Sequence, residues 1–226
     1  MIIVGITGTI GSGKSTTSSI LSCMGYDVFD ADFCIKELIK EPKYMKKILE
    51  NFGTIISNLY REERINIKLL SEHVFSDLSE LKKLEKILHP GVFEKKATFI
   101  LKKALSRKKI IFLDIPLLYE SNSYLHCDYI LHMKVNKKVQ DYRVLKRKNM
   151  NKQKYNFILY KQSNSIKFNI NKIFNINSGI GKFYVRQQIR SFLTKINRTK
   201  RNFLWSKMNS RSFYAKNSFR YRDNRS

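Results

Sequence analysis

Apolar residues occur along the chain in two patterns. Short apolar runs bounded by polar residues predict strands, and the continuous run at residues 110–114 suits a strand that is buried on both faces, as in a parallel sheet. Longer segments, in which apolar residues recur every three or four positions, predict helices. The predicted strands are residues 2–7, 27–30, 110–114, 129–133 and 172–176, and the helices that alternate with them include residues 14–24, 137–148 and 182–196. This alternation predicts an α/β fold whose parallel sheet carries helices on both faces.

Residues 33–108 interrupt the alternation, because the segment is too long for a single crossover between two strands. Within it, residues 78–88 and 92–106 both show apolar residues at helical spacing. His89 and Pro90 separate them, and Pro90 is suited to begin the second helix. We therefore expect a helical, substrate-holding subdomain at 33–108, inserted into a core made of residues 1–32 and 109–197.

A glycine-rich motif directly follows the first predicted strand. Residues 8–15 read Gly-Thr-Ile-Gly-Ser-Gly-Lys-Ser and match the phosphate-binding pattern G-x-x-x-x-G-K-[ST]. In this pattern backbone N–H groups surround the phosphates of a nucleotide, and the next helix points its positive end at them. We therefore expect Lys14 to reach the β- and γ-phosphates of ATP and the Ser15 hydroxyl to bind Mg²⁺. An ordinary glycine-rich turn would not require the Lys14-Ser15 pair, but the motif alone does not distinguish a kinase from a GTPase or a motor.

The charge is the unusual feature of the composition. The 226 residues include 44 Lys and Arg against 18 Asp and Glu, which gives a net charge of +26. A surplus of this kind is typical of proteins that bind nucleic acid or an anionic membrane. Here the basic residues are spread along the chain with abundant Asn and Ile rather than gathered in one motif. This distribution favours compositional drift and an anionic small-molecule substrate over specific nucleic-acid binding.

Several further features bear on location. The chain has no run of 18 apolar residues, so we expect no transmembrane helix. Cleavage of a leader at the first apolar run would remove the phosphate loop, and we therefore expect a cytoplasmic protein. Its three widely spaced cysteines, Cys23, Cys34 and Cys127, are typical of reduced thiols. Residues 198–226 carry nine Lys or Arg and one Asp without apolar periodicity, which predicts a poorly ordered basic tail.

The order of several motifs resembles that of the dephospho-CoA kinase family. These motifs are residues 8–15, Asp30-Ala31-Asp32, His89-Pro90, Pro116-Leu117-Leu118-Tyr119-Glu120 and Gln140-x-x-Arg143-x-x-x-Arg147. The resemblance extends over about residues 1–195. It implies transfer of the γ-phosphoryl group of ATP to the 3′-hydroxyl of dephospho-coenzyme A. It also implies a phosphate-loop (P-loop) core, a coenzyme A-binding helical subdomain at 33–108 and a lid at about 148–171.

The resemblance assigns roles to particular residues. Gly11, Ser12, Gly13, Lys14, Ser15 and Thr16 match the family's ATP-binding segment, and Asp32 matches its catalytic carboxylate. Asp32 follows the second predicted strand, where open α/β sheets place their ligands, and could orient the acceptor hydroxyl and accept its proton. From the residues alone, a helix N-cap is an equally good reading of Asp32.

The other candidates each have a structural alternative. Arg143 and Arg147 are one helical turn apart and could close on the transferring phosphoryl group, or could belong to a solvated basic face. Asp30 and Asp114 follow strands, where a carboxylate can act near a metal ion or simply begin a turn. Arg64 resembles an arginine near the family's coenzyme A side but could be a surface charge. We expect structural roles for His89 and Glu120.

Two segments depart from the family pattern. Thr9 stands where the family usually has glycine, at a position that the motif leaves free. Residues 149–171 are rich in Asn and Lys, although Gln162 and Asn177-x-Gly179 still match. We expect these differences to affect rate and lid behaviour rather than reaction type. Two other functions stay open from the sequence, another small-molecule P-loop kinase and a basic nucleic-acid-binding ATPase.

Overall fold

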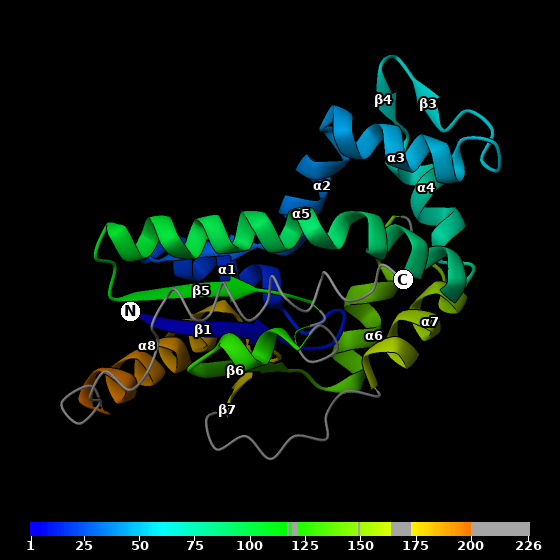
Figure 1. Cartoon of the computed structure of the whole chain (residues 1–226). Helices are drawn as coiled ribbons and strands as arrows, with labels where there is room; N and C mark the ends of the chain where they lie inside the picture. The colour runs from blue at the N-terminus through cyan, green and yellow to red at the C-terminus, as the bar shows by residue number, and fades with distance from the viewer. Residues whose placement is uncertain (117, 119–121, 149, 164–172, 200–226) are drawn as a thin grey trace. The chain divides into compact units, whose positions relative to one another are not determined.

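The computed structural model describes residues 1–116, 118, 122–148, 150–163 and 173–199 (Figure 1). The chain divides into a unit Met1–Arg186, which holds the sheet, and a second unit Gln187–Ser226. Helix α8, Lys182–Thr199, crosses that boundary. The predicted basic tail lies outside the described residues from residue 200 onward.

Five parallel strands form the sheet in the spatial order β2-β5-β1-β6-β7. Their bounds are β1 Ile2–Thr7, β2 Asp27–Asp30, β5 Ile110–Asp114, β6 Tyr129–Lys134 and β7 Ile173–Asn177. Each of these strands was predicted from the sequence, and helices flank the sheet, so the predicted α/β class is confirmed (Figure 1). Parallel pairing brings the carboxyl ends of the strands to one edge, where Asp30 lies opposite Asp114 and Thr7 opposite His132.

The helices of the first unit fall into two groups. Helices α1 (Lys14–Cys23), α6 (Lys137–Leu145) and α7 (Lys152–Ser163) belong to the predicted core and lid segments. Segment 33–108 contains most of α2 (Ala31–Lys40), then α3 (Pro42–Phe52), the hairpin β3 (Tyr60–Arg61) and β4 (Arg64–Ile65), α4 (Ile67–Val74) and α5 (Leu78–Leu105). A short 3₁₀ helix, η1, covers Ser123–His126. In the described part of the chain, no helix combines the length and the apolar composition needed to cross a bilayer.

Helix α5 corrects one prediction. The sequence predicted two helices with Pro90 at the start of the second, whereas α5 is one helix of 28 residues with Pro90 inside it. A proline there removes one backbone hydrogen bond and costs about 3 kcal/mol. Packing on both sides of the proline offsets this cost, because Leu88 is buried against the core before it and Phe99 contacts Phe29 of β2 after it, with ring centroids 5.6 Å apart.

A single hydrophobic core joins the sheet to the helices of segment 33–108. Buried side chains of β2 and β5 belong to the same cluster as Ile48, Phe52 and Leu70 from α3 and α4. Gly91 lets these helices approach α5, since a Cβ atom at this position would lie 2.6 Å from Cζ of Tyr44 and 2.9 Å from Cδ2 of Leu38. Helices α2 and α3 therefore pack closely on the middle of α5. That segment 33–108 is a separate subdomain that holds the substrate stays a prediction.

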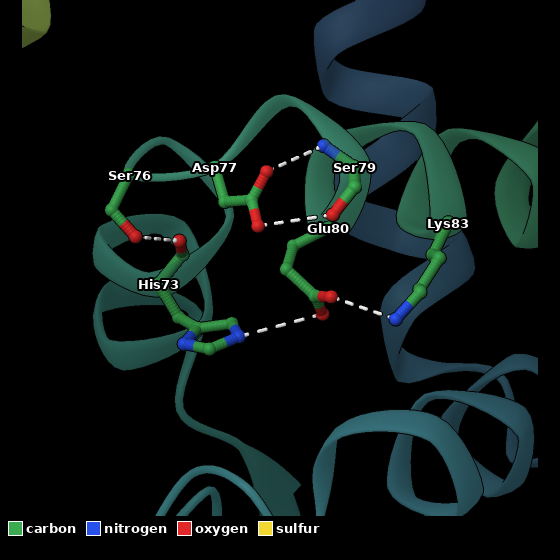
Figure 2. A network of polar contacts seen from close by, with 6 residues as sticks. All are labelled: His73, Ser76, Asp77, Ser79, Glu80 and Lys83. Atoms are coloured by element: carbon green, nitrogen blue, oxygen red, sulfur yellow. Dashed lines mark hydrogen bonds and ion pairs between the residues drawn. The ribbon is translucent and has the colours of Figure 1, made fainter.

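Polar contacts hold the turn from α4 into α5 (Figure 2). Asp77 is the N-cap of α5 and accepts hydrogen bonds from N–H of Ser79 at 2.7 Å and from its hydroxyl at 3.0 Å. Glu80, in the first turn, lies 2.7 Å from Nζ of Lys83 and 3.5 Å from Nε2 of His73 on α4. His73 and Glu80 thus bring side chains of α4 and α5 close together at this turn.

We predict that Gly91→Ala destabilises the fold. Alanine normally gains about 1 kcal/mol over glycine in a helix, but overpacking a core costs about 1–3 kcal/mol, and Tyr44 is buried with little room to move. We expect a net loss of up to about 2 kcal/mol in the free energy of unfolding, which is the difference between these two effects, measured by urea denaturation. Lys86→Ala, at an exposed position of the same helix, is the control and should change stability by less than about 0.5 kcal/mol. Equal stability of the two variants would contradict the prediction.

Candidate active site

The phosphate loop between β1 and α1 has the backbone that its glycines permit. Gly8, Gly11 and Gly13 have φ angles of +148°, +78° and +92°, values that other residues rarely adopt. A Cβ atom on Gly11 would lie 2.6 Å from Cγ2 of Val144, so this position also lacks space for a side chain. Thr9 is not among the residues with positive φ, which explains why the loop accepts a side chain where the family usually has glycine.

The loop leads into α1 with an anion-binding geometry. Gly13 is the N-cap, and the N–H of Thr17 is the donor that closes the first turn, onto the carbonyl of Gly13 at 3.0 Å. The N–H groups ahead of Thr17 in the helix have no carbonyl of their own helix to bond, and they point out of its positive end. A phosphate group at this end would satisfy them.

The side chains of the predicted ATP-binding segment lie around this helix end. Lys14 donates a hydrogen bond to the carbonyl of Gly8 at 2.6 Å and so folds back over the loop. Ser15 is exposed and Thr16 is half-buried. The hydroxyl of Ser12 is buried and has no hydrogen-bond partner among the described residues, although buried hydroxyls normally have one. An unsatisfied polar atom under the loop is consistent with a site that is completed by a ligand.

The structure separates the roles of the two aspartates in Asp30-Ala31-Asp32. Asp30 is the N-cap of α2 and accepts a hydrogen bond from N–H of Phe33 at 2.9 Å. Asp32 lies in the first turn of α2 without capping it, so the N-cap alternative applies to Asp30 and is wrong for Asp32. The carboxylate of Asp32 therefore remains available for a ligand.

The pKa of Asp32 is raised above its usual value, first by desolvation and then by the charge of Asp30. Lys14 and Lys36 act in the opposite direction and lower this pKa. The residue as a whole nevertheless keeps an exposed surface. A carboxylate with a raised pKa that is open to solvent on one side can accept a proton from a bound hydroxyl group.

Asp114, at the end of β5, is the buried carboxylate of the site. It accepts a hydrogen bond from the hydroxyl of Ser18 on α1 at 2.6 Å. Burial raises the pKa of Asp114 to about 6, while the Ser18 hydrogen bond and the charge of Lys14 oppose the rise. Asp30 and Asp32 raise it further, which shows that the three carboxylates and Lys14 form one electrostatic cluster beside the loop.

Arg143 of α6 also contacts the loop. Its guanidinium donates to the carbonyl of Ser178 at 2.9 Å, to the hydroxyl of Ser178 at 3.0 Å and, at 3.5 Å, to the carbonyl of Gly11. It therefore joins the phosphate loop to the residue that follows β7. Arg147 is exposed, and none of its contacts in the described part of the chain supports a role at the site.

Two glutamines also contact the loop, and no role was predicted for them although both matched the family pattern. Gln140 of α6 is buried and donates to the carbonyl of Ile10 at 2.7 Å and to the hydroxyl of Thr9 at 2.9 Å. Gln162 of α7 accepts from the N–H of Ile10 at 2.8 Å. Only the motif spacing could have drawn attention to them, because a single glutamine carries no chemical signature of its own.

The remaining candidates are not brought to the loop by any described contact. Arg64 lies in the β3–β4 hairpin and His89 is exposed in α5. Leu117, Tyr119 and Glu120 of the Pro116–Glu120 motif lie outside the described residues, as do residue 149 and residues 164–171 of the predicted lid. Within the described part of the chain, no three His, Cys, Asp or Glu side chains are grouped so as to hold a metal ion. The Ser15 hydroxyl and nucleotide phosphates are ligands that Mg²⁺ could use at this site.

Comparison with known proteins points to one family. A family model described as dephospho-CoA kinase matches residues 2–178. A dephospho-CoA kinase from Bartonella quintana is 33% identical over 196 residues, which cover 87% of this chain and 98% of the relative. A dephospho-CoA kinase from Fusobacterium nucleatum is 38% identical over 155 residues, which cover 68% of this chain and 77% of the relative.

Solved structures agree on the fold. The TT1252 protein from Thermus thermophilus has a TM-score of 0.63 at 25% identity, with 86% of this chain and 97% of that chain covered. A dephospho-CoA kinase from Campylobacter jejuni has a TM-score of 0.60 at 24% identity, with 88% of this chain and 98% of that chain covered. The fold of this chain thus matches theirs over most of its length.

We predict that Asp114→Asn stabilises the ligand-free protein at neutral pH. Between the usual pKa of 3.8 and the raised value of about 6, the folded state holds a proton that the unfolded state has lost, so wild-type stability falls as pH rises through this window. Asparagine does not titrate and can still accept the Ser18 hydrogen bond. The stability of the variant relative to wild type should therefore increase by up to about 3 kcal/mol between pH 4 and pH 8, measured by urea denaturation with EDTA.

Asp27→Asn is a control whose expected effect on stability at neutral pH has the opposite sign. A hydrogen bond from Lys103, at 2.6 Å, is the main cause of the lowered pKa of Asp27. A lowered pKa contributes stability above the usual pKa and loses it as pH falls, so this variant should be less stable than wild type at pH 7 and approach it at acid pH. A stability difference for Asp114→Asn that does not change with pH would contradict the first prediction.

Proposed function

The chain belongs to the dephospho-CoA kinase family, and we propose that its phosphate loop and Asp32 carry out the reaction of that family. It is an ATP-using phosphotransferase that acts at the final step of coenzyme A biosynthesis. The substrates implied by the family are ATP and dephospho-coenzyme A. We propose the 3′-hydroxyl of the dephospho-coenzyme A ribose as the acceptor.

In the proposed mechanism the loop holds the donor. Backbone N–H groups of Gly11, Gly13 and Thr16 surround the phosphates, while the Ser12 N–H is already bonded to the carbonyl of Thr9 at 3.0 Å, and Lys14 neutralises charge on the β- and γ-phosphates. The left-handed φ angles of Gly11 and Gly13, together with the helix end at Lys14, support this part of the proposal. The buried hydroxyl of Ser12 supports it too, since a ligand would give it a partner.

Asp32 prepares the acceptor in this mechanism. Its carboxylate receives a hydrogen bond from the 3′-hydroxyl and accepts the proton as the hydroxyl oxygen forms a bond to the γ-phosphorus. The bond between that phosphorus and the oxygen bridging to the β-phosphate breaks, and ADP leaves. The observation that carries the proposal is the position of Asp32, exposed at the strand edge beside the loop, with a raised pKa and the charge of Lys14 close to it.

We propose two further contributions to charge balance. Arg143, held beside the loop by Ser178 and Gly11, would donate to the phosphoryl group during transfer. Mg²⁺ would be held by the exposed hydroxyl of Ser15 together with phosphate oxygens, a ligand set that suits this ion. When bound it would neutralise charge on the phosphates.

The proposal extends to the arrangement of the chain. Segment 33–108 would bind the coenzyme A moiety, and residues 148–171, which include α7, would form the lid. The surplus of 44 Lys and Arg over 18 Asp and Glu suits substrates that each carry several phosphate charges. We propose a cytoplasmic location, where ATP is available and where the three cysteines, which are unpaired in the structure, would stay reduced.

We predict that the purified protein converts dephospho-coenzyme A to coenzyme A with ATP and Mg²⁺, and that Asp32→Asn lowers kcat by about 100-fold or more. The amide keeps the size of the side chain but does not accept the proton. Product formation is followed by chromatography. The pH profile of kcat/KM for wild type should fall on the acid side through the raised pKa of Asp32, because only the ionised carboxylate accepts a proton.

The same assay separates the alternatives. Asp30→Asn serves as the matched variant, because it keeps the N-cap acceptor for Phe33 and should retain most of the wild-type kcat. Turnover of a nucleoside or shikimate in preference to dephospho-coenzyme A would indicate a different small-molecule kinase. ATP hydrolysis stimulated by DNA or RNA would favour the nucleic-acid alternative. Unchanged kcat in Asp32→Asn would remove this residue from the mechanism.

A further inference from the structure

The peptide backbone at Ile10 is held from outside the phosphate loop by two glutamine side chains. Gln162 of α7 accepts a hydrogen bond from the N–H of Ile10 at 2.8 Å. Gln140 of α6 donates to the C=O of the same residue at 2.7 Å. Both polar groups of one loop residue are thus satisfied by side chains from two different helices. We call Gln140 and Gln162 the glutamine clamp.

The chemistry of the loop fixes which way each amide faces. The carbonyl of Ile10 only accepts, so the atom of Gln140 that faces it must be the NH₂ group. The N–H of Ile10 only donates, so the atom of Gln162 that faces it must be the carbonyl oxygen. The hydroxyl of Thr9 then accepts the second hydrogen of the Gln140 amide at 2.9 Å. The clamp therefore satisfies all of these groups with a single arrangement.

The loop needs such support because its backbone is intrinsically mobile. Glycine loses more conformational freedom on folding than any other residue, and three glycines stand within Gly8–Gly13. Without restraint, an empty loop would populate other conformations, and ATP affinity would fall by the fraction of molecules that are not competent to bind. The clamp acts on Thr9 and Ile10, ahead of the loop's last two glycines, and leaves the N–H groups at the start of α1 to the phosphates.

The hydroxyl of Thr9 is a second reason to assign a supporting role to Gln140. A glycine at this site would offer Gln140 no hydroxyl, whereas Thr9 gives its NH₂ group a second acceptor. Gln140 is only 6% exposed, so an amide hydrogen without a partner there would be costly. The threonine and the buried glutamine are therefore matched to one another in this chain.

We propose that Gln140 and Gln162 are positioning residues that hold the phosphate loop in its ATP-binding conformation, with the Thr9 hydroxyl completing the contact. The proposal rests on the proposed role of the loop as the ATP site. The glutamines do not touch the reacting atoms. Their effect is on the affinity for nucleotide, and once ATP is bound the chemical step proceeds as before.

The test uses the full-length protein and the variants Gln140→Leu, Gln162→Leu and Thr9→Val, which keep side-chain size and remove the polar contact. We expect KM for ATP, and the Kd of ATP measured by calorimetry, to rise about three- to tenfold for each hydrogen bond lost. The kcat at saturating ATP and the KM for dephospho-coenzyme A should stay within about twofold of wild type. This split separates a positioning role from a folding defect, which would lower kcat and melting temperature together.

Two control variants match the test. Thr9→Ser keeps the hydroxyl and should bind ATP like wild type. Gln187→Leu changes an exposed glutamine on α8, outside the proposed lid, and should have no effect on KM for ATP. Thr9→Val and Gln140→Leu should be non-additive when combined, because they remove the same contact.

The outcomes are distinguishable. If wild type makes coenzyme A and binds ATP, but Gln140→Leu and Gln162→Leu bind ATP as tightly as wild type, the clamp is overturned and the proposed function stands. The clamp is also overturned if kcat, both KM values and the melting temperature all change together in Gln162→Leu, whose side chain is only partly buried. If wild type binds no nucleotide, both proposals fail.

Discussion

The left-handed backbone at Gly11 and Gly13 is the constraint on which the rest of the site depends. It turns the chain from the end of β1 into α1 within a few residues, so that the helix begins beside the carboxyl ends of the strands. Its neighbours are built around the missing side chains, since Val144 of α6 occupies the space next to Gly11 and Ser178 lies where a Cβ atom on Gly13 would come within 3.0 Å. Any residue other than glycine would thus disturb the loop, α6 and the end of β7 together.

The local charge of the site differs from that of the whole chain. A net charge of +26 would favour any anion, yet the residues nearest the loop include the carboxylates of Asp30, Asp32 and Asp114. These carboxylates repel one another, and the raised pKa values of Asp32 and Asp114 include that repulsion as well as desolvation. They would repel a triphosphate as well, so Lys14, the positive end of α1 and a metal ion are needed to offset them. The same repulsion among carboxylates lowers the stability of the folded protein when no nucleotide is bound, a cost that is common where function requires buried charge.

The sequence was informative where local physics decides the structure. Apolar runs predicted the central strands β1, β5 and β6, because buried parallel strands have few polar positions, and the glycine-rich motif predicted the loop, because few other residues can adopt its backbone. The predicted family is confirmed by the match over residues 2–178.

Tertiary contacts overrode local signals elsewhere. Helix α5 continues past Pro90 because its packing against the core offsets the cost of the proline. The β3–β4 hairpin turns at Glu62 and Glu63, which have φ angles of 49° and 59°, although the usual Asn-Gly turn signal is absent there. Gln140 and Gln162 were matched but given no role, because their contacts join segments that are far apart in the chain.

Helix α7 shows why those distant contacts matter for function. One end of it reaches the loop through Gln162, while Phe157 packs edge-on against Phe75, just past α4, with ring centroids 6.4 Å apart, and Lys154 lies 3.3 Å from the hydroxyl of Ser71. Helix α4 belongs to the segment proposed to hold coenzyme A, so the same helix contacts both the nucleotide loop and the acceptor side. A displacement of α7 changes both sets of contacts at once. If both substrates favour the same position of α7, each raises the affinity for the other by the same factor, because coupling between two binding equilibria is reciprocal.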